Sequence, residues 1–327
     1  MEVRPDAVLD RRLSIDAVSV TERAAVAAAR WRGRGDEPAA DEAAIQGAHR
    51  ELMRAQLSGR IIVGEGAQAE SERLHVGESI GVGGPQVDIA VDALEGTTLC
   101  AKNMAGSISV MVIAEAGSLL QVPAVYMEKV AVGPGYPPGV VSLSAAPEEN
   151  IKALAAARGV TPSEITALVL DRPRHATLIE AIRSTGASVK FITDGDVAGI
   201  IHTTSPQVSG VDIYLGSGGA AEGILAAAAL RCLGGQMEGR LVLDTDAKRK
   251  QAKAMGVSNP SKIYSLHDMV RGDCIVSITG VTDGPLLSGV RLMRDTVETE
   301  TLLMRAAARV VRRISSTHRD LGRFVSE

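Results

Sequence analysis

The chain has 327 residues, a formal net charge of −4 at pH 7, and 45% hydrophobic and 23% charged residues. This length and balance are typical of a soluble globular protein with one large or two medium domains. With a slight excess of acidic groups and only 2% aromatic residues, the chain offers neither a positive field nor a stacking surface for bases. We therefore expect no nucleic-acid partner.

The cysteines and the hydrophobic runs bear on the compartment. Cys100, Cys232 and Cys274 are far apart and odd in number, which argues against a disulfide framework or a structural zinc site. The acidic amino terminus lacks the apolar region of a secretory signal, and the Ala-rich run 220–233 is too short to span a bilayer. We therefore expect a cytoplasmic location and no membrane partner.

In chain order, residues 1–12 read as a loose tail. Helical patterns follow over 14–32 and 41–57, and the loop 33–41 between them contains two glycines and a proline. Asp41 opens the second helical pattern, where a carboxylate commonly serves only as an N-cap.

A short predicted strand at 60–63 leads to the stretch 87–100, V-D-I-A-V-D-A-L-E-G-T-T-L-C. Its alternating β-branched residues predict a buried strand, and Asp92 and Glu95 lie at the end of that pattern, before Gly96. Carboxylate oxygens suit Mg²⁺ or Mn²⁺, and a glycine followed by free N–H groups suits a phosphate. The alternative is a solvated turn with two acidic side chains, and this stretch alone leaves both interpretations open.

A further strand is expected at 108–114. The turn-rich loop 133–139, G-P-G-Y-P-P-G, and the polar segment after it predict a domain junction. We therefore divide the chain into a first half, 1–140, and a second half, 141–327.

The second half changes to alternating strands and helices. Thr161-Pro-Ser-Glu164 has the form of a capping box, which predicts the start of a helix. Strands expected at 167–170, 188–192 and 211–215 each lead into a polar or glycine-rich loop, and a parallel arrangement would gather these loops at one edge of a sheet. A strand is also expected at 274–279, whereas residues 298–313 fit a helix or a strand.

Several short motifs occur together in a recognisable order. They are G-R-G-D at 33–36, V-G-E-G at 63–66, D-A-L-E-G-T at 92–97, Y-M-E-K at 126–129, R-P-R-H at 172–175, D-G-D at 194–196 and G-G-A-A-E-G at 218–223. As an ordered set they resemble the class II fructose-1,6-bisphosphatases, a branch of the lithium-sensitive, metal-dependent sugar phosphatases, over about residues 14–318. The resemblance implies an α/β fold with a layered α-β-α-β-α architecture in two halves, the first binding metal and phosphate and the second binding sugar.

The resemblance also implies roles for individual residues. It implies Mg²⁺ or Mn²⁺ as cofactor, a phosphorylated sugar as substrate, hydrolysis of the C1 phosphate of fructose 1,6-bisphosphate, and a homo-oligomer. The implied metal ligands are Asp41, Glu65, Asp92, Glu95 and Glu222. The implied substrate contacts are Glu95, Gly96, Thr97, Tyr126, Arg172, Arg174, Asp194, Asp196 and Gly219, and the candidate catalytic residues are Thr97, Glu95 and Glu70.

The chain departs from the family pattern near the water that would attack the phosphate. Ala69 stands where the family has an aspartate that helps to activate this water, and Glu37 stands where the family has a lysine. Glu70, the next residue, is a candidate replacement base. Two alternatives follow: a diverged enzyme for another sugar phosphate, or a protein that binds sugar phosphate and hydrolyses it poorly.

Two further signals carry less weight. Residues 216–221 match G-x-G-x-x-A after a predicted strand, as in dinucleotide-binding oxidoreductases, but Glu238, at the expected distance for a ribose contact, lies in a glycine-rich turn. Among the histidines only His175 lies near the proposed site, and we interpret it as a packed or hydrogen-bonded scaffold residue.

Overall fold

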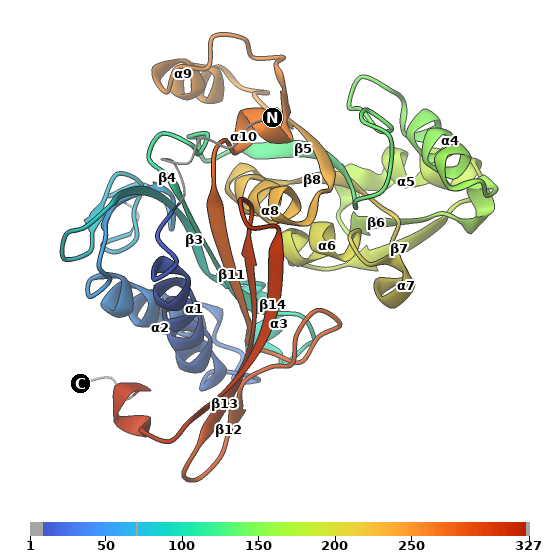
Figure 1. Ribbon diagram of the computed structural model, residues 1–327. Coiled ribbons are helices and arrows are strands. Elements are labelled where there is room, and N and C mark those ends of the chain that lie inside the picture. The colour runs from blue at the N-terminus through green and yellow to red at the C-terminus, as the bar shows by residue number, and fades with distance from the viewer. Residues whose placement is uncertain (1–8, 70, 325–327) are drawn as a thin grey trace. The chain divides into compact units, whose positions relative to one another are not determined.

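The computed structural model describes residues 9–69 and 71–324, which form two compact units. The first unit comprises Met1–Leu119 and Arg271–Glu327, and the second comprises Leu120–Val270. The turn-rich loop 133–139, near the predicted junction, thus belongs to the second unit, and the carboxy-terminal strands belong to the first (Figure 1). Among the described residues, no helix is long and apolar enough to cross a membrane.

The first unit is built on a mixed eight-stranded sheet. Its order is β12-β13-β11-β4-β3-β1-β2, with β14 also paired to β13. Within this sheet, only the pair of β1 with β3 is parallel among the pairings of its described strands. The strands are β1 (Ser58–Val63), β2 (Ser79–Ile80), β3 (Gln86–Glu95), β4 (Ile108–Glu115), β11 (Cys274–Gly280), β12 (Arg291–Leu292), β13 (Val297–Arg305) and β14 (Val310–His318).

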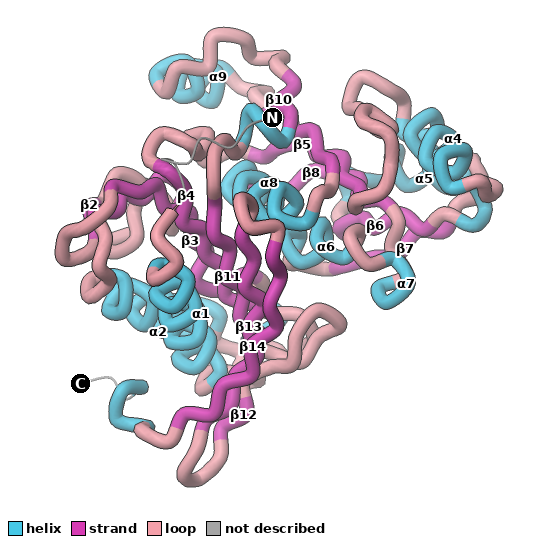
Figure 2. The backbone as a smooth tube through the Cα atoms, viewed as in Figure 1, coloured by secondary structure: helices cyan, strands magenta, loops and turns pink. Residues whose placement is uncertain are grey.

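Two Ala-rich helices cover this sheet, α1 (Leu13–Ala29) and α2 (Glu37–Leu52), as Figures 1 and 2 show. Small residues let them approach closely: a Cβ on Gly47 of α2 would lie only 3.0 Å from the backbone oxygen of Arg23 in α1. Their buried alanines and valines pack with the central strands into one core. The short helix α3 (Thr97–Ala101) follows β3 directly.

The predicted helices and strands of the first unit are largely confirmed, and the main difference is in the bounds of the second helix. The second helix begins at Glu37 rather than Asp41, because the Asp36 side chain accepts the Ala39 N–H at 3.0 Å and caps it. Asp41 therefore lies inside the helix, and its interpretation as an N-cap is wrong. Residues 298–313, left open between helix and strand, contribute to the hairpin of β13 and β14.

Most of the predicted tail, residues 1–8, lies outside the described residues. At Leu9 the chain is already buried, and its backbone N–H donates to the Asp273 carboxylate. Arg305 bonds to both Leu9 and Asp273, so the end of the tail is held against the carboxy-terminal strands.

The second unit contains a six-stranded sheet in the order β10-β9-β5-β8-β6-β7. The strands β6, β7 and β8 are parallel, as predicted, whereas β5 runs antiparallel to β8. The strands are β5 (Tyr126–Val132), β6 (Thr166–Leu170), β7 (Ser188–Ile192), β8 (Ile213–Gly219), β9 (Gln236–Leu241) and β10 (Ile263–Ser265). The helices are α4 (Pro147–Arg158), α5 (Ala176–Ser184), α6 (Asp196–His202), α7 (Pro206–Ser209), α8 (Ala220–Leu233), α9 (Asp246–Ala254) and α10 (Leu266–Met269).

Alternating residues of this sheet serve two different faces. Val130 and Val132 of β5 join a core with apolar residues of α4 and α5 on one face. The alternate residues of β5 on the other face, such as Met127, point toward α8. A Cβ on Gly223 of α8 would lie 2.7 Å from the Met127 sulfur. The predicted helix start at Thr161 is a capped 3-10 turn, Pro162–Glu164, while the helix α4 lies earlier in the chain.

Candidate active site

The carboxyl end of β3 brings two predicted metal ligands together. The register of β3 against β4 shifts between Asp92 and Glu95, and this irregularity re-aims the side chains at the strand end. Asp92 and Glu95 each offer a carboxylate oxygen within 4.8 Å of the other. Glu95 is buried, and the Ser107 hydroxyl donates to its backbone oxygen at 3.1 Å.

Glu65 lies beside this pair because of the backbone around it. Its Oε1 accepts the N–H of Ala93, the residue after Asp92, at 2.9 Å. The preceding residue must be glycine, since a Cβ on Gly64 would lie 2.0 Å from the backbone oxygen of Leu74. The structure thus places three of the predicted metal ligands of the first unit around the end of β3.

Asp41 lies inside α2, and its electrostatics suit a cation. Burial, with a smaller contribution from neighbouring Glu42, raises the pKa of the Asp41 carboxyl to about 6. A half-buried carboxylate in such surroundings is stabilised by a bound cation, and the oxygen donors of these four residues match the preference of Mg²⁺ and Mn²⁺. The residues present therefore fit a divalent metal.

The predicted phosphate binders follow β3. Gly96 has φ +81°, a left-handed conformation that favours glycine, and it precedes the first residue of α3, Thr97. The G-R-G-D loop is tied to α3, since the Gly33 and Gly35 N–H groups donate to the backbone oxygens of Cys100 and Ala101. Thr97 is half-buried and accessible to a ligand.

The position at which we expect the water-activating aspartate of the family carries no carboxylate in this chain. Ala69 is exposed in the loop after β1, and the candidate base Glu70 lies outside the described residues. Glu37, in place of the family lysine, is the first residue of α2.

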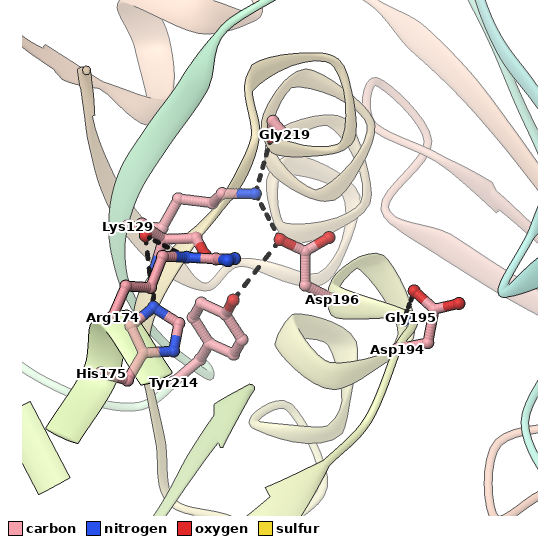
Figure 3. Close-up of polar contacts among 9 residues, drawn as sticks. Lys129, Arg174, His175, Asp194, Gly195, Asp196, Tyr214 and Gly219 are labelled. Atoms are coloured by element: carbon pink, nitrogen blue, oxygen red, sulfur yellow. Dashed lines mark hydrogen bonds and ion pairs between the residues drawn. The ribbon is translucent and has the colours of Figure 1, made fainter. Parts of the chain in front are cut away.

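In the second unit the predicted sugar contacts lie at the carboxyl ends of the three parallel strands. Arg172 and Arg174 follow β6, Asp194 and Asp196 follow β7, and Gly219 ends β8. The expectation that these loops gather at one sheet edge is confirmed by the bonds between them, several of which are drawn in Figure 3.

Arg174 is held in two directions. Its guanidinium donates to the backbone oxygen of Ser217 at 2.7 Å and to the Ser217 hydroxyl at 3.0 Å. It also lies 4.6 Å from the ring centroid of Tyr126, the other predicted sugar contact in this loop cluster. An arginine fixed in this way presents a pre-set positive charge to a phosphate.

His175 bonds to Ser217, which in turn holds Arg174. These bonds confirm the interpretation of His175 as a scaffold residue. The ring is buried; Nε2 accepts the Ser217 N–H at 2.9 Å, so Nδ1 carries the proton and donates to the Leu170 oxygen at 2.7 Å. Burial lowers the pKa of His175, and the positive charges of Arg174 and Arg172 act in the same direction.

Glu222 lies on the first turn of α8, after the two glycines of G-G-A-A-E-G. A Cβ on Gly219 would lie 1.8 Å from Glu222 Oε2, so only glycine leaves room for this carboxylate. Burial raises the pKa of Glu222, and the negative charge of Asp196 raises it further. This environment also favours a neighbouring positive charge.

Sequence reasoning missed two residues of this cluster. Lys129 donates to Asp196 and to Gly219, and Ser217 joins His175 to Arg174. A signal for Lys129 was present, since Met127–Val132 reads M-E-K-V-A-V, with a charge inside an apolar run. Ser217 carried no such signal, because its role depends on contacts across the sheet.

The mixed α/β fold and the carboxylates around the end of β3 fit the class of phosphoric monoester hydrolases. Over residues 11–318 the chain matches the family model described as bacterial fructose-1,6-bisphosphatase, glpX-encoded, and it belongs to this family. The resemblance found in the motifs is thereby confirmed.

Curated relatives are similar to this chain over nearly its full length. The chain is 40% identical to fructose-1,6-bisphosphatase 1 class 2 of Escherichia coli (strain K12), over 94% of this chain and 95% of the relative. It is 37% identical to the D-fructose 1,6-bisphosphatase class 2/sedoheptulose 1,7-bisphosphatase of Synechococcus sp. (strain JA-3-3Ab), over 95% of this chain and 96% of the relative.

Proposed function

We propose that this protein hydrolyses the C1 phosphate of fructose 1,6-bisphosphate, giving fructose 6-phosphate and inorganic phosphate, with Mg²⁺ or Mn²⁺ as cofactor. The observation that carries the proposal is the pair of carboxylates at the end of β3, directly before the Gly96–Thr97 turn, in a member of this family. Carboxylates that hold cations beside a phosphate-binding turn are the parts that phosphate ester hydrolysis requires.

In the proposed site, Asp41 and Glu65 hold one cation, and Asp92, Glu95 and Glu222 hold a second. Glu222 belongs to the second unit, and its part in the metal site rests on the family resemblance. Divalent cations held here would neutralise the charge of the phosphate and acidify the attacking water. The N–H groups of Gly96 and Thr97 would bind oxygens of the phosphate that is cleaved.

In the proposed site, the protein gives little help in removing the proton of the attacking water. The Thr97 hydroxyl would orient the water, but Ala69 has no group that accepts its proton. We propose that hydrolysis is slow for this reason, since a general base commonly contributes about 10²-fold to 10⁴-fold. Glu70 is the candidate replacement base.

The second unit binds the rest of the substrate. Arg172 and Arg174 would hold the phosphate that is not cleaved, because a guanidinium presents paired donors to phosphate oxygens. Asp194 and Asp196 would accept hydrogen bonds from sugar hydroxyls, and Tyr126 and Gly219 would border the sugar. We also propose that the protein acts in the cytoplasm as a homo-oligomer.

The test is phosphate release with Mg²⁺ or Mn²⁺ from fructose 1,6-bisphosphate, fructose 1-phosphate and sedoheptulose 1,7-bisphosphate, the last named for one relative. We expect release from fructose 1,6-bisphosphate that stops when EDTA removes the metal. Rapid hydrolysis of another sugar phosphate, with none of this one, would replace our proposal with a diverged enzyme.

A second candidate function follows from Ala69 alone. A protein with an intact sugar site and no water-activating aspartate could bind sugar phosphate without turning it over. Tight binding of fructose 1,6-bisphosphate, with no phosphate release over hours in either metal, would favour this function over ours.

A further inference from the structure

Lys129 occupies a position where the fold predicts an apolar side chain. Alternate residues of β5 face α8, and the neighbours of Lys129 on that face are Met127 and Ala131, both fully buried. Lys129 itself has 0% exposure. Because a buried ammonium is costly unless it is paired, such a departure from the pattern usually marks a site with a function.

The ammonium is paired within the second unit by residues that we place in the sugar site. Its Nζ donates to Asp196 Oδ2 at 2.5 Å and to the Gly219 backbone oxygen at 2.8 Å (Figure 3). Tyr214 adds a weaker bond to the same Asp196 oxygen, at 3.4 Å. Lys129 therefore links the start of α6 to the end of β8.

The backbone around the pair is shaped to leave it room. A Cβ on Gly218 would lie 2.1 Å from Asp196 Oδ2 and 3.2 Å from Lys129 Nζ. A Cβ on Gly223 would contact the Lys129 side chain at 3.7 Å and would lie 2.7 Å from the Met127 sulfur. Any larger residue at Gly218 would displace the carboxylate, so this glycine is required by the ion pair.

We propose that Lys129 is a positioning residue for sugar recognition, which holds the Asp196 carboxylate toward a sugar hydroxyl and fixes the Gly219 backbone at the start of α8. This inference rests on the proposed function, since it takes Asp196 as a sugar contact. Both side-chain partners of Asp196 among the described residues use Oδ2, which leaves Oδ1 for the hydroxyl. Lys129 acts through Asp196 and need not touch the substrate.

The experiment measures ligand binding to the full-length protein by calorimetry in the presence of Mn²⁺. The two probes are fructose 6-phosphate and inorganic phosphate, which carries no sugar hydroxyl. Lys129→Met should weaken binding of fructose 6-phosphate by about 10-fold to 100-fold, the range for a lost bond to a charged group, and should change binding of inorganic phosphate by less than about twofold. Lys190→Met, which removes a lysine bonded to the Ser209 backbone oxygen in the same sheet, should change neither.

A second variant keeps the test valid if Lys129→Met does not fold. Tyr214→Phe removes one donor to Asp196 and leaves no unpaired charge, so it should weaken fructose 6-phosphate binding by about twofold to fivefold. In an Asp196→Asn background the same change should have no further effect, because the two residues act through one carboxylate. An additive effect in that background would contradict the inference.

The outcomes separate this inference from the proposed function. If the wild type hydrolyses fructose 1,6-bisphosphate and Lys129→Met binds fructose 6-phosphate normally, the inference is wrong and the function stands. An equal loss of both probes in folded Lys129→Met would assign Lys129 a general structural role and also overturn it. If the wild type binds fructose 6-phosphate without hydrolysis of the bisphosphate, only the function fails, and if it binds no sugar phosphate both fail.

Discussion

The carboxylates at the end of β3 in the first unit and Asp196 in the second unit are held in opposite ways. In the first unit Asp92 and Glu95 place like charges within 4.8 Å of each other, and burial raises the pKa of Asp41 to about 6. In the second unit the buried Asp196 is matched by the Lys129 ammonium at 2.5 Å. Two neighbouring carboxylates can share a cation from solution, whereas an internal ion pair is complete within the protein.

This difference assigns separate tasks to the units. The first unit gathers negative charge that a ligand must neutralise, so its geometry depends on what it binds. The second unit is organised in advance: Ser217 and His175 fix Arg174, and Lys129 fixes Asp196. We therefore expect changes in the first unit to act mainly on turnover, and changes in the second mainly on affinity.

The largest expected effect comes from the metal site. Asp92→Asn should lower kcat/KM for fructose 1,6-bisphosphate by more than about 100-fold, because loss of even an indirect partner of a metal costs about 10-fold to 100-fold. It should also remove most of the rise in melting temperature that millimolar Mg²⁺ or Mn²⁺ produces in the wild type. Thermal melts with and without metal measure the second effect.

The control for this charge change is Asp36→Asn in the same unit. Asp36 is the N-cap of α2, and asparagine caps a helix as well as aspartate does, so the metal-induced shift should persist. If neither Mg²⁺ nor Mn²⁺ changed the melting temperature of the wild type, there would be no basis for assigning a metal to the first unit.

The next largest effect concerns the arginine that Ser217 holds. Arg174→Ala should raise KM by about 10-fold to 100-fold, as expected for lost bonds to a charged group, with a smaller change in kcat. Contact with the phosphate that is not cleaved is similar in the ground state and the transition state, which is why affinity carries the loss. Steady-state kinetics on fructose 1,6-bisphosphate measure both constants.

Arg183→Ala is the matched control, because Arg183 lies on α5, at 5.8 Å from the Phe191 ring, and has no predicted ligand role. It should leave KM within about twofold of the wild type. If Arg174→Ala instead lowered kcat with KM unchanged, Arg174 would belong to the reacting end of the substrate.

A gain of function is expected at Ala69. Ala69→Asp should raise kcat by about 10-fold or more, because it supplies the carboxylate that the family places beside the attacking water. Gln68→Asp adds the same charge to the same exposed loop and should not raise kcat. If Ala69→Asp gains nothing while Glu70→Gln is inactive, Glu70 has taken over as the base.

Much of the fold could be predicted because local patterns and tertiary packing agree. The helix predicted at 14–32 and the strand that begins near Val87 are rich in apolar residues, and both are buried over most of their length. The start of α2 was misplaced because two carboxylates, Asp36 and Asp41, both suit an N-cap, and only the position of Pro38 at the first turn favours the former.

Some residues of the candidate site could likewise be predicted from local sequence patterns, and others could not. Ligands at strand ends, such as Asp92 and Glu95, could be predicted from the sequence, since an apolar strand that stops at acidic residues is a local signal. Residues that position a ligand-binding side chain, such as Lys129, could not be predicted from the sequence. Lys129 meets Asp196 only because β5 pairs with β8 and α6 packs beside them. A single sequence does not show which residues far apart in the chain are in contact.

The smallest effect is a pH dependence of sugar-phosphate binding that originates at His175. Burial lowers its pKa, so the neutral ring, with Nε2 as acceptor for Ser217, predominates above the unfolded value of about 6.5. As the pH falls through the lowered folded pKa, protonation removes this acceptor and the stability that it contributes. The charged groups that act on the ring, Arg174 and Arg172, are both positive and oppose its protonation.

We therefore expect binding of fructose 6-phosphate to weaken by about twofold to fivefold on acidification, as Ser217 releases Arg174. The phosphate of the ligand also titrates, at about pH 6, so the wild type must be compared with His175→Asn, which keeps a neutral acceptor. The ratio of the two dissociation constants should be constant above pH 7 and should rise for the wild type at lower pH. A ratio that stays flat while His175 becomes protonated would show that the orientation of Arg174 does not depend on His175, and that the second unit is less tightly organised than its hydrogen bonds indicate.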